Sequence, residues 1–353
     1  MQTDSIELGF LSIFALITFF IFLIINNYSS KISNGIFLDD DFNKPQSFHN
    51  EAITRSGGIA SFICLIFFFG IYYLLYSELL IEYFLVCSSL FVIGYFDDIK
   101  IRISPNKRLF LMVITLFILI NFIPIRINNI DFIFLSYLME SKIFSVIFVL
   151  ICFLFVINGA NFIDGFNGLL TINLIIINSI LLYINLNNDH LKISYFITSQ
   201  LIILVTFLLF NFPKAKMFLG DSGSYLFGSL ISLNSIITNN LNPQISSFFF
   251  CILLFYLFFE VFFSFVRKTY QNKSPVLPDR EHLHMLSFIS ISKFYGSEKG
   301  NYVNSIVINL VYGFFILPSI FFADNSLICK IWFFSLILIY FLIYQRLYRL
   351  TKN

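Results

Sequence analysis

The sequence predicts an all-α, polytopic integral membrane protein with about eleven transmembrane helices, on the basis of its composition, its hydropathy and its long apolar runs. Of its 353 residues, 58% are hydrophobic and only 12% are charged, and the mean hydropathy is +0.86. A soluble domain carries roughly twice that share of charge and could not bury so much apolar surface. The composition excludes a soluble globular protein, and we expect residues 1–353 to form a single transmembrane domain.

Eleven apolar runs meet or approach the length of about 17 to 20 residues that a helix needs to cross hydrocarbon. They are Leu8–Ile25, Gly57–Tyr76, Leu79–Phe96, Leu109–Pro124, Ile143–Ile157, Leu169–Ile184, Tyr195–Phe212, Tyr225–Ile237, Phe248–Val266, Val303–Ala323 and Ile331–Tyr344. The first run has no basic cluster before it and no cleavage site after it, so we expect a retained span rather than a signal peptide. The shorter patch Ile130–Met139 is expected to be an interfacial or re-entrant segment.

The distribution of basic residues predicts the orientation, because cytoplasmic loops carry an excess of Lys and Arg. With the N-terminus outside, 18 of the 22 Lys and Arg residues fall on the inner side. We therefore expect a cytoplasmic C-terminus and a cytoplasmic face that contains the active site. The loops expected to form that face are residues 26–56, 97–108, 158–168, 213–224 and 267–302.

Two polar motifs follow the ends of predicted spans. Asp97 and Asp98 follow the third span, where adjacent carboxylates are unfavourable unless a cation or proton relieves them, although a solvated loop start would also explain them. After the fifth span, four amide or carboxylate side chains recur at every third residue and would face one way on a helical turn. They are Asn158, Asn161, Asp164 and Asn167. A tight turn explains the adjoining glycines but not this oxygen-rich spacing.

Two further motifs lie on the same predicted face. Asp221 stands between glycines before the eighth span, where backbone amides can approach an anion, although a glycine-rich helix start is the simpler explanation. The longest inner loop contains Arg280, His282 and His284, which suit a nucleotide diphosphate or, less specifically, anionic lipid headgroups. The hard carboxylate ligands favour Mg²⁺, and zinc is disfavoured because no thiol lies nearby.

These motifs, in this order, resemble the polyprenyl-phosphate N-acetylhexosaminyl-1-phosphate transferase family, which is glycosyltransferase family 4. The resemblance extends from about Lys44 to Met285. Its blocks are Lys44-Pro45-Gln46-Ser47-Phe48-His49 with Thr54-Arg55-Ser56-Gly57-Gly58, Asp97-Asp98, Asn161-x-x-Asp164-Gly165, Phe218-x-Gly220-Asp221-x-Gly223-Ser224, and Asp279-Arg280-x-His282-x-His284. The last block resembles the undecaprenyl-phosphate N-acetylglucosaminyl branch more than the pentapeptide branch. This chain departs from the family pattern at two positions. It has Asn167 where the family usually has Asp, and Met285 where a third His is common.

The resemblance implies transfer of an N-acetylhexosamine 1-phosphate from a UDP-sugar to undecaprenyl phosphate. The expected donor is UDP-N-acetylglucosamine or a close relative of it. The transfer would release UMP and form a lipid-linked diphosphate sugar, which would start a surface polysaccharide of the O-antigen, teichoic acid or capsule type. The resemblance also implies a multi-pass protein of the bacterial cytoplasmic membrane that has no nucleic-acid partner. Whether the protein forms a homodimer stays open. The alternatives are a phospho-N-acetylmuramoyl-pentapeptide transferase or, from hydropathy alone, a transporter of an anionic or lipid-linked solute.

The resemblance and the charge of two reacting phosphates together imply the roles of individual residues. The catalytic residues are expected to be Asp97, Asp98, Asp164 and Asp221. Asp221 would be the main ligand of Mg²⁺, which Mn²⁺ could replace, with Asp98 or Asp164 assisting, while Asp97 would deprotonate or orient the lipid phosphate. The expected substrate-binding residues are Lys107, Arg108, His282 and His284 for donor phosphates, Asn161, Asp164 and Asn167 for the nucleoside, and also Lys44, His49, Arg55 and Arg280.

Overall fold

The computed structural model describes residues 2–32, 35–39, 52–101, 103–123, 125–275, 277 and 279–352. Nearly all of the secondary structure in these residues is helical, which confirms the predicted all-α class. The helices are α1 (Gln2–Ile32), α2 (Gly57–Tyr76), α3 (Ile81–Asp98), α4 (Pro105–Phe122), α5 (Ile133–Met139), α6 (Lys142–Ile163), α7 (Leu169–Asn187), α8 (Leu191–Asn211), α9 (Gly220–Leu241), α10 (Ser247–Leu253), α11 (Phe255–Tyr270), α12 (Leu283–Ile316), the 3₁₀ helix η1 (Leu317–Phe322) and α13 (Ser326–Lys352). Two short antiparallel strands, β1 (Leu38–Asp39) and β2 (Ile53–Thr54), precede α2.

The chain is a multi-pass membrane protein. Within the described residues, eight helical segments are long and apolar enough to cross a membrane, or nine if the bent pair α10–α11 forms one span. Each of the eleven predicted runs lies largely in helix, but the runs in α3 and α9 fall outside this set, so the number eleven stays a prediction. The patch predicted to be interfacial contains the short helix α5, which has no buried residues.

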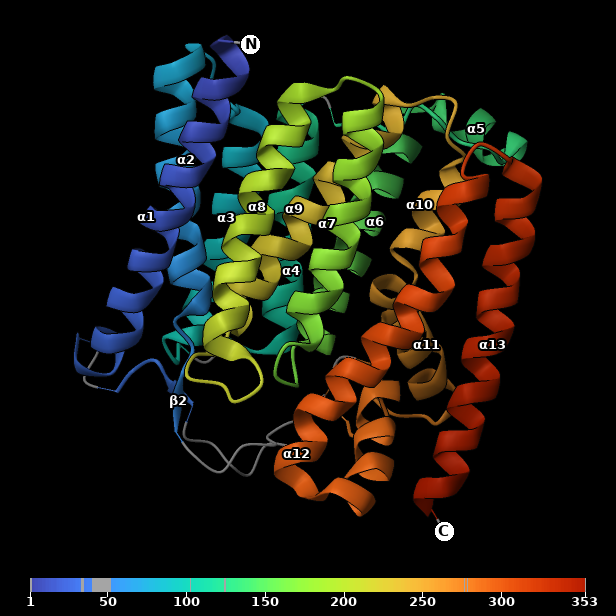
Figure 1. The fold of residues 1–353 in the computed structure, drawn as a ribbon. Helices are drawn as coiled ribbons and strands as arrows, with labels where there is room; N and C mark the ends of the chain where they lie inside the picture. Colours follow the sequence, from blue (N-terminus) through green and yellow to red (C-terminus); the bar gives the residue numbers. More distant parts are fainter. Residues whose placement is uncertain are drawn as a thin grey trace.

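Helix α9 lies at the centre of the bundle, where it packs most extensively against α3 and α6 (Figure 1). Its first turn comes unusually close to α2 and α3. A Cβ added to Gly94 of α3 would lie 2.4 Å from the backbone oxygen of Asp221, and one added to Gly58 of α2 would lie 2.3 Å from Ser222 Oγ. The absence of side chains at these glycines lets the backbones meet, and this contact fixes the position of Asp221.

The segment predicted as the longest loop is partly helical. Residues 267–302 include the first half of α12, whose buried face carries Leu283, Met285 and Phe288. Gly296, with φ 75° and ψ 169°, interrupts α12, and Figure 1 shows the helix doubling back at the lower end of the molecule. Burial of this short apolar face explains why a polar-looking stretch folds into helix. The two chain ends lie at opposite ends of the bundle (Figure 1).

Candidate active site

Arg108 joins two carboxylates that come from different helices. Its Nη1 atom donates to Asp97 Oδ2 at 2.8 Å and to Asp221 Oδ2 at 2.5 Å. Asn161 Nδ2 donates to the other oxygen of Asp221, Oδ1, at 2.9 Å, and to Ser224 Oγ at 3.1 Å. Helices α3, α4, α6 and α9 thus bring four of the predicted site residues into one hydrogen-bonded cluster.

Asp98 has a different position from its neighbour. Both of its carboxylate oxygens accept backbone N–H groups at 2.9 Å, from Asp221 and Ser222 in the first turn of α9. The side chain is fully buried, and Arg55 Nη1 lies 4.0 Å from Oδ1. Asp98 therefore holds the start of α9, and with it Asp221. Its predicted role as a metal ligand stays a prediction.

Arg55 connects this cluster to the strand pair. Its Nε and Nη2 atoms donate to Asp39 Oδ2 at 3.1 and 2.7 Å. Asp39 was not predicted from the sequence, because nothing distinguishes it from other loop carboxylates. The ring of Tyr225 was also missed, although the Arg108 guanidinium lies 5.7 Å from its centroid. Arg55 and Arg108 are thus fixed, partly buried cations beside the carboxylates.

The three carboxylates around these cations have different proton affinities. Burial and the nearby charge of Asp221 raise the pKa of Asp97, which follows the predicted span, to about 6. Burial also raises the pKa of Asp164 well above its usual value, and the charge of Asp221 adds to the effect. At Asp221 burial acts in the same direction, but the guanidinium groups of Arg108 and Arg55 outweigh it and lower the pKa. Asp221 is thus the most firmly ionised of the three.

A polar cavity of about 130 Å³ lies between these groups, and Asp164 and Asp221 both line it. Within the part of the chain that the structure describes, no three His, Cys, Asp or Glu side chains form a ready metal site. Mg²⁺, however, usually takes only one or two carboxylates and completes its shell with water and substrate phosphates. Asp164, Asp221 and the amide oxygen of Asn161, which also lines the cavity, are hard donors of the required type, so these residues fit Mg²⁺.

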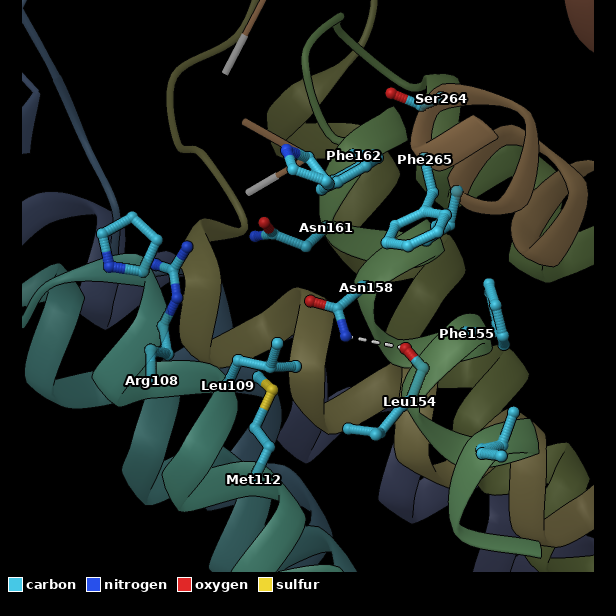
Figure 2. A pocket seen from close by; sticks show the side chains of 14 residues that line it. Arg108, Leu109, Met112, Leu154, Phe155, Asn158, Asn161, Phe162, Ser264 and Phe265 are labelled. Atoms are coloured by element: carbon cyan, nitrogen blue, oxygen red, sulfur yellow. Dashed lines mark hydrogen bonds between the residues drawn. The ribbon is translucent and has the colours of Figure 1, made fainter. Parts of the chain in front are cut away.

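A second, mostly apolar cavity of about 310 Å³ opens beside Arg108. Figure 2 shows Arg108 and Asn161 on one side of it, and Leu109, Met112, Leu154, Phe155 and Phe265 among the side chains that continue the wall. Asn158, also in the wall, donates its Nδ2 to the backbone oxygen of Leu154 at 2.7 Å. The cavity therefore leads from an apolar region to two residues that hydrogen-bond to Asp221.

The histidine motif lies inside the protein. His282 Nδ1 is 2.9 Å from Glu260 Oε1, which also accepts the backbone N–H of Leu283 at 3.1 Å. Tyr340 of α13 donates its hydroxyl to Glu260 Oε2 at 2.8 Å. His282 and His284 are 2% and 0% exposed, and their rings stack with centroids 5.4 Å apart. The predicted contact of these histidines with donor phosphates stays a prediction.

Two phenylalanines of the polar cavity connect it to the histidines. The ring of Phe162 lies 5.1 Å from that of His282, and the ring of Phe166 lies 5.9 Å from that of His284. The histidines thus support the wall of the polar cavity. Glu260 is conspicuous in the sequence as a carboxylate within an apolar run, whereas nothing in the sequence marks Tyr340.

The remaining predicted residues occupy varied positions. Asn167 lines the polar cavity, whereas Lys107, in the first turn of α4, and Arg280, before α12, are exposed. Lys44 and His49 lie outside the described residues. The structure therefore brings Asp97, Asp98, Asp164, Asp221, Arg55, Arg108, Asn161 and Asn167 around one site and leaves Lys107 at the surface.

The chain is similar to proteins of a known family. The family model described as glycosyl transferase family 4 matches residues 79–239. An undecaprenyl-phosphate alpha-N-acetylglucosaminyl 1-phosphate transferase from Thermotoga maritima is 27% identical over 280 residues, which cover 79% of this chain and 81% of the relative. A protein of the same name from Escherichia coli K12 is 24% identical over 302 residues, 81% of this chain and 77% of the relative. A phospho-N-acetylmuramoyl-pentapeptide-transferase from Clostridium perfringens strain 13 is 27% identical over 153 residues, 41% of this chain and 48% of the relative.

Proposed function

Since the chain belongs to glycosyl transferase family 4, we propose that it transfers N-acetylglucosamine 1-phosphate, or a close N-acetylhexosamine relative, from a UDP-sugar to undecaprenyl phosphate. The reaction releases UMP and leaves a lipid-linked diphosphate sugar, which starts a surface polysaccharide of the O-antigen, teichoic acid or capsule type. The donor is proposed from the names of the two relatives that this chain matches along most of its length.

One observation carries this proposal: the apolar cavity and the carboxylate cluster share Arg108 and Asn161. An acceptor with a long isoprenoid tail and a phosphate head needs an apolar path that ends at fixed positive charge. The cavity supplies the apolar wall, and Arg108 supplies the charge where the phosphate would arrive. The polar cavity, which Asp164 and Asp221 line, suits the water-soluble donor.

The roles of the side chains follow from their charges. Arg108, which the resemblance assigned to the donor phosphates, lines the apolar cavity, and its proposed role is therefore to bind the acceptor phosphate instead. It keeps that phosphate near Asp97, whose raised pKa suits it to accept a proton from the phosphate. Asp98 keeps the first turn of α9 in place, and Asn161 orients the Asp221 carboxylate. Asp221 and Asp164 would hold Mg²⁺. When bound, that ion neutralises charge on the donor diphosphate and on the departing UMP.

The proposed topology has eleven spans, an outer N-terminus and a cytoplasmic C-terminus in a bacterial cytoplasmic membrane. The excess of Lys and Arg on one side supports it. The two chain ends lie at opposite ends of the bundle, as an odd number of spans requires (Figure 1). The active site would then face the cytoplasm, which contains the UDP-sugar donor.

The experiment that separates this enzyme from a transporter uses membranes that contain the chain and matched membranes that lack it. Both are incubated with UDP-N-acetylglucosamine labelled in the sugar, Mg²⁺ and undecaprenyl phosphate. The proposal requires UMP and an organic-extractable labelled lipid in equal amounts, both dependent on added undecaprenyl phosphate. Label that enters sealed vesicles without UMP release would instead indicate a transporter. A panel of other UDP-sugars in the same assay identifies the donor.

A further inference from the structure

A third cavity lies away from the carboxylate cluster, between the C-terminal half of α11 and the C-terminal half of α13. Its volume is about 340 Å³. These two helices pack against each other through aromatic side chains. The ring centroids of Phe263 in α11 and Tyr344 in α13 lie 4.6 Å apart. Figure 1 shows α13 ending at this lower end of the bundle. Its wall includes the side chains of Phe263, Arg267, Gln271, Phe341, Gln345 and Arg349.

The wall contains buried polar atoms that lack a partner among the described residues. Arg267 is 8% exposed, and its Nη1 and Nη2 atoms pair with Glu281 at 2.5 Å and Asp279 at 2.8 Å. Its Nε–H has no hydrogen-bond acceptor, and Gln271 Oε1 has no donor. A buried guanidinium N–H without an acceptor is costly, so this cavity favours a ligand that brings an acceptor for Arg267 and a donor for Gln271.

The charges around the cavity favour an anion. Asp279 and Glu281 are the two carboxylates here, and they are already shared by Arg267, Lys268 and Lys273. Arg349 adds a further exposed cation to the wall. The side chains within the described residues of this region therefore carry an excess of positive charge. A phosphate diester meets this excess and supplies the missing acceptor.

The opposite part of the wall is apolar and faces outward from the bundle. Phe341 is 44% exposed and lines the cavity, while Phe262, Phe265 and Leu338 on the same two helices are 47%, 54% and 60% exposed. Large apolar side chains at such exposure on spanning helices face acyl chains. The cavity thus combines a cationic end with a lipid-facing end, as a site at the membrane interface requires.

We propose that this cavity binds one anionic phospholipid from the adjacent leaflet. The phosphate diester accepts the Nε–H of Arg267 and pairs with Arg349, a headgroup hydroxyl donates to Gln271 Oε1, and the acyl chains lie along Phe263 and Phe341. Phosphatidylglycerol has each of these groups. A free phosphate would satisfy the cations but would leave the apolar wall uncovered, so the bilayer is the source that fits.

The site is connected to the histidine motif. Arg267 holds Asp279 and Glu281, and the hydroxyl of Tyr344 donates to the backbone oxygen of Glu281 at 3.0 Å. His282 follows directly. A bound lipid would therefore fix the segment that leads into the histidines. The binding itself does not depend on the proposed transfer reaction, because it is measured without either substrate.

The test is native mass spectrometry of the purified full chain in mild detergent, titrated with phosphatidylglycerol or with phosphatidylcholine of the same acyl chains. We expect one saturable phosphatidylglycerol molecule and markedly weaker binding of phosphatidylcholine. Arg349→Ala and, as an independent variant, Gln345→Glu should each weaken phosphatidylglycerol binding by about fivefold or more. Arg346→Ala removes the same charge from the same helix outside the cavity, and it should change binding by less than about twofold.

Three results would overturn the proposal. Equal affinity for the two lipids would show that the charge of the headgroup does not matter. Equal weakening by Arg346→Ala and Arg349→Ala would indicate general attraction to a positive helix end. Displacement of the lipid by glycerol phosphate at the same concentration would make this a site for a free phosphate and not for a lipid.

Discussion

Replacement of Gly220 by Ala tests whether Asp98 positions Asp221. Gly220 begins α9 with a left-handed φ of +78°, directly before Asp221. A Cβ at this position would lie 2.7 Å from both carboxylate oxygens of Asp98. These are the oxygens that accept the backbone N–H groups of Asp221 and Ser222 at 2.9 Å. The carboxylate must withdraw, and the start of α9 loses at least part of its support.

Two costs set the size of this effect. A non-glycine residue in the left-handed region costs about 1 to 2 kcal/mol. Loss of one hydrogen bond to a charged group costs about 1.5 to 3 kcal/mol. We expect Gly220→Ala to destabilise the fold by about 3 kcal/mol, and to lower kcat by at least about tenfold because displacement of Asp221 removes stabilisation of the transition state.

The assay compares initial transfer rates and thermal unfolding midpoints of the purified variant with those of Gly70→Ala. Gly70 lies in α2, and a Cβ added there would have nothing within 4 Å. Gly70→Ala therefore makes the same chemical change at a position away from the site. Ala there should leave both quantities unchanged or slightly raise the midpoint. If Gly220→Ala matched Gly70→Ala in rate and midpoint, the positioning role of Asp98 would be wrong.

Three further changes probe other parts of the account. Because burial raises the pKa of Asp97 to about 6, log kcat should rise with pH below about 6 and level off above it. Asp97→Asn should remove this rise from the residual activity, and an unchanged rise would assign it to the acceptor phosphate instead. Tyr340→Phe loses the 2.8 Å bond to Glu260 and should destabilise the fold by about 1 to 2 kcal/mol, which an unchanged thermal midpoint would contradict. Leu154→Trp should obstruct the apolar cavity and raise KM for undecaprenyl phosphate but not for the UDP-sugar, so an equal rise in both would argue against an acceptor site there.

Much of the fold follows from the sequence, because apolar length alone predicts where helices can lie in a membrane. The predicted runs all lie largely in helix. The helix in residues 283–295 was missed because its apolar face is short and its polar neighbours look like a loop. Gly296, which bends α12, has no signal that separates it from other loop glycines.

Many members of the candidate site were predictable, although Asp39 and Tyr225 were missed, and the contacts among them were not predictable. Asp97, Asp98 and Asp221 stand out because carboxylates are rare in this chain and these follow or precede apolar runs. That Arg108 links Asp97 to Asp221, while Asp98 accepts backbone N–H groups, depends on how α3 and α9 pack against each other. Sequence spacing carries no information on such contacts between distant segments.

The central claim is that the Asp221 carboxylate, held by Arg108 and Asn161 beside the apolar cavity, is required for sugar-phosphate transfer. The measurement that tests it most directly is the rate of UMP release and lipid-product formation by purified Asp221→Asn. Asp189→Asn is the matched control, because it makes the same change at an exposed position in the turn after α7. We expect a loss of about a hundredfold to a thousandfold for Asp221→Asn and near-normal rates for the control. Full transfer by Asp221→Asn would contradict the central claim.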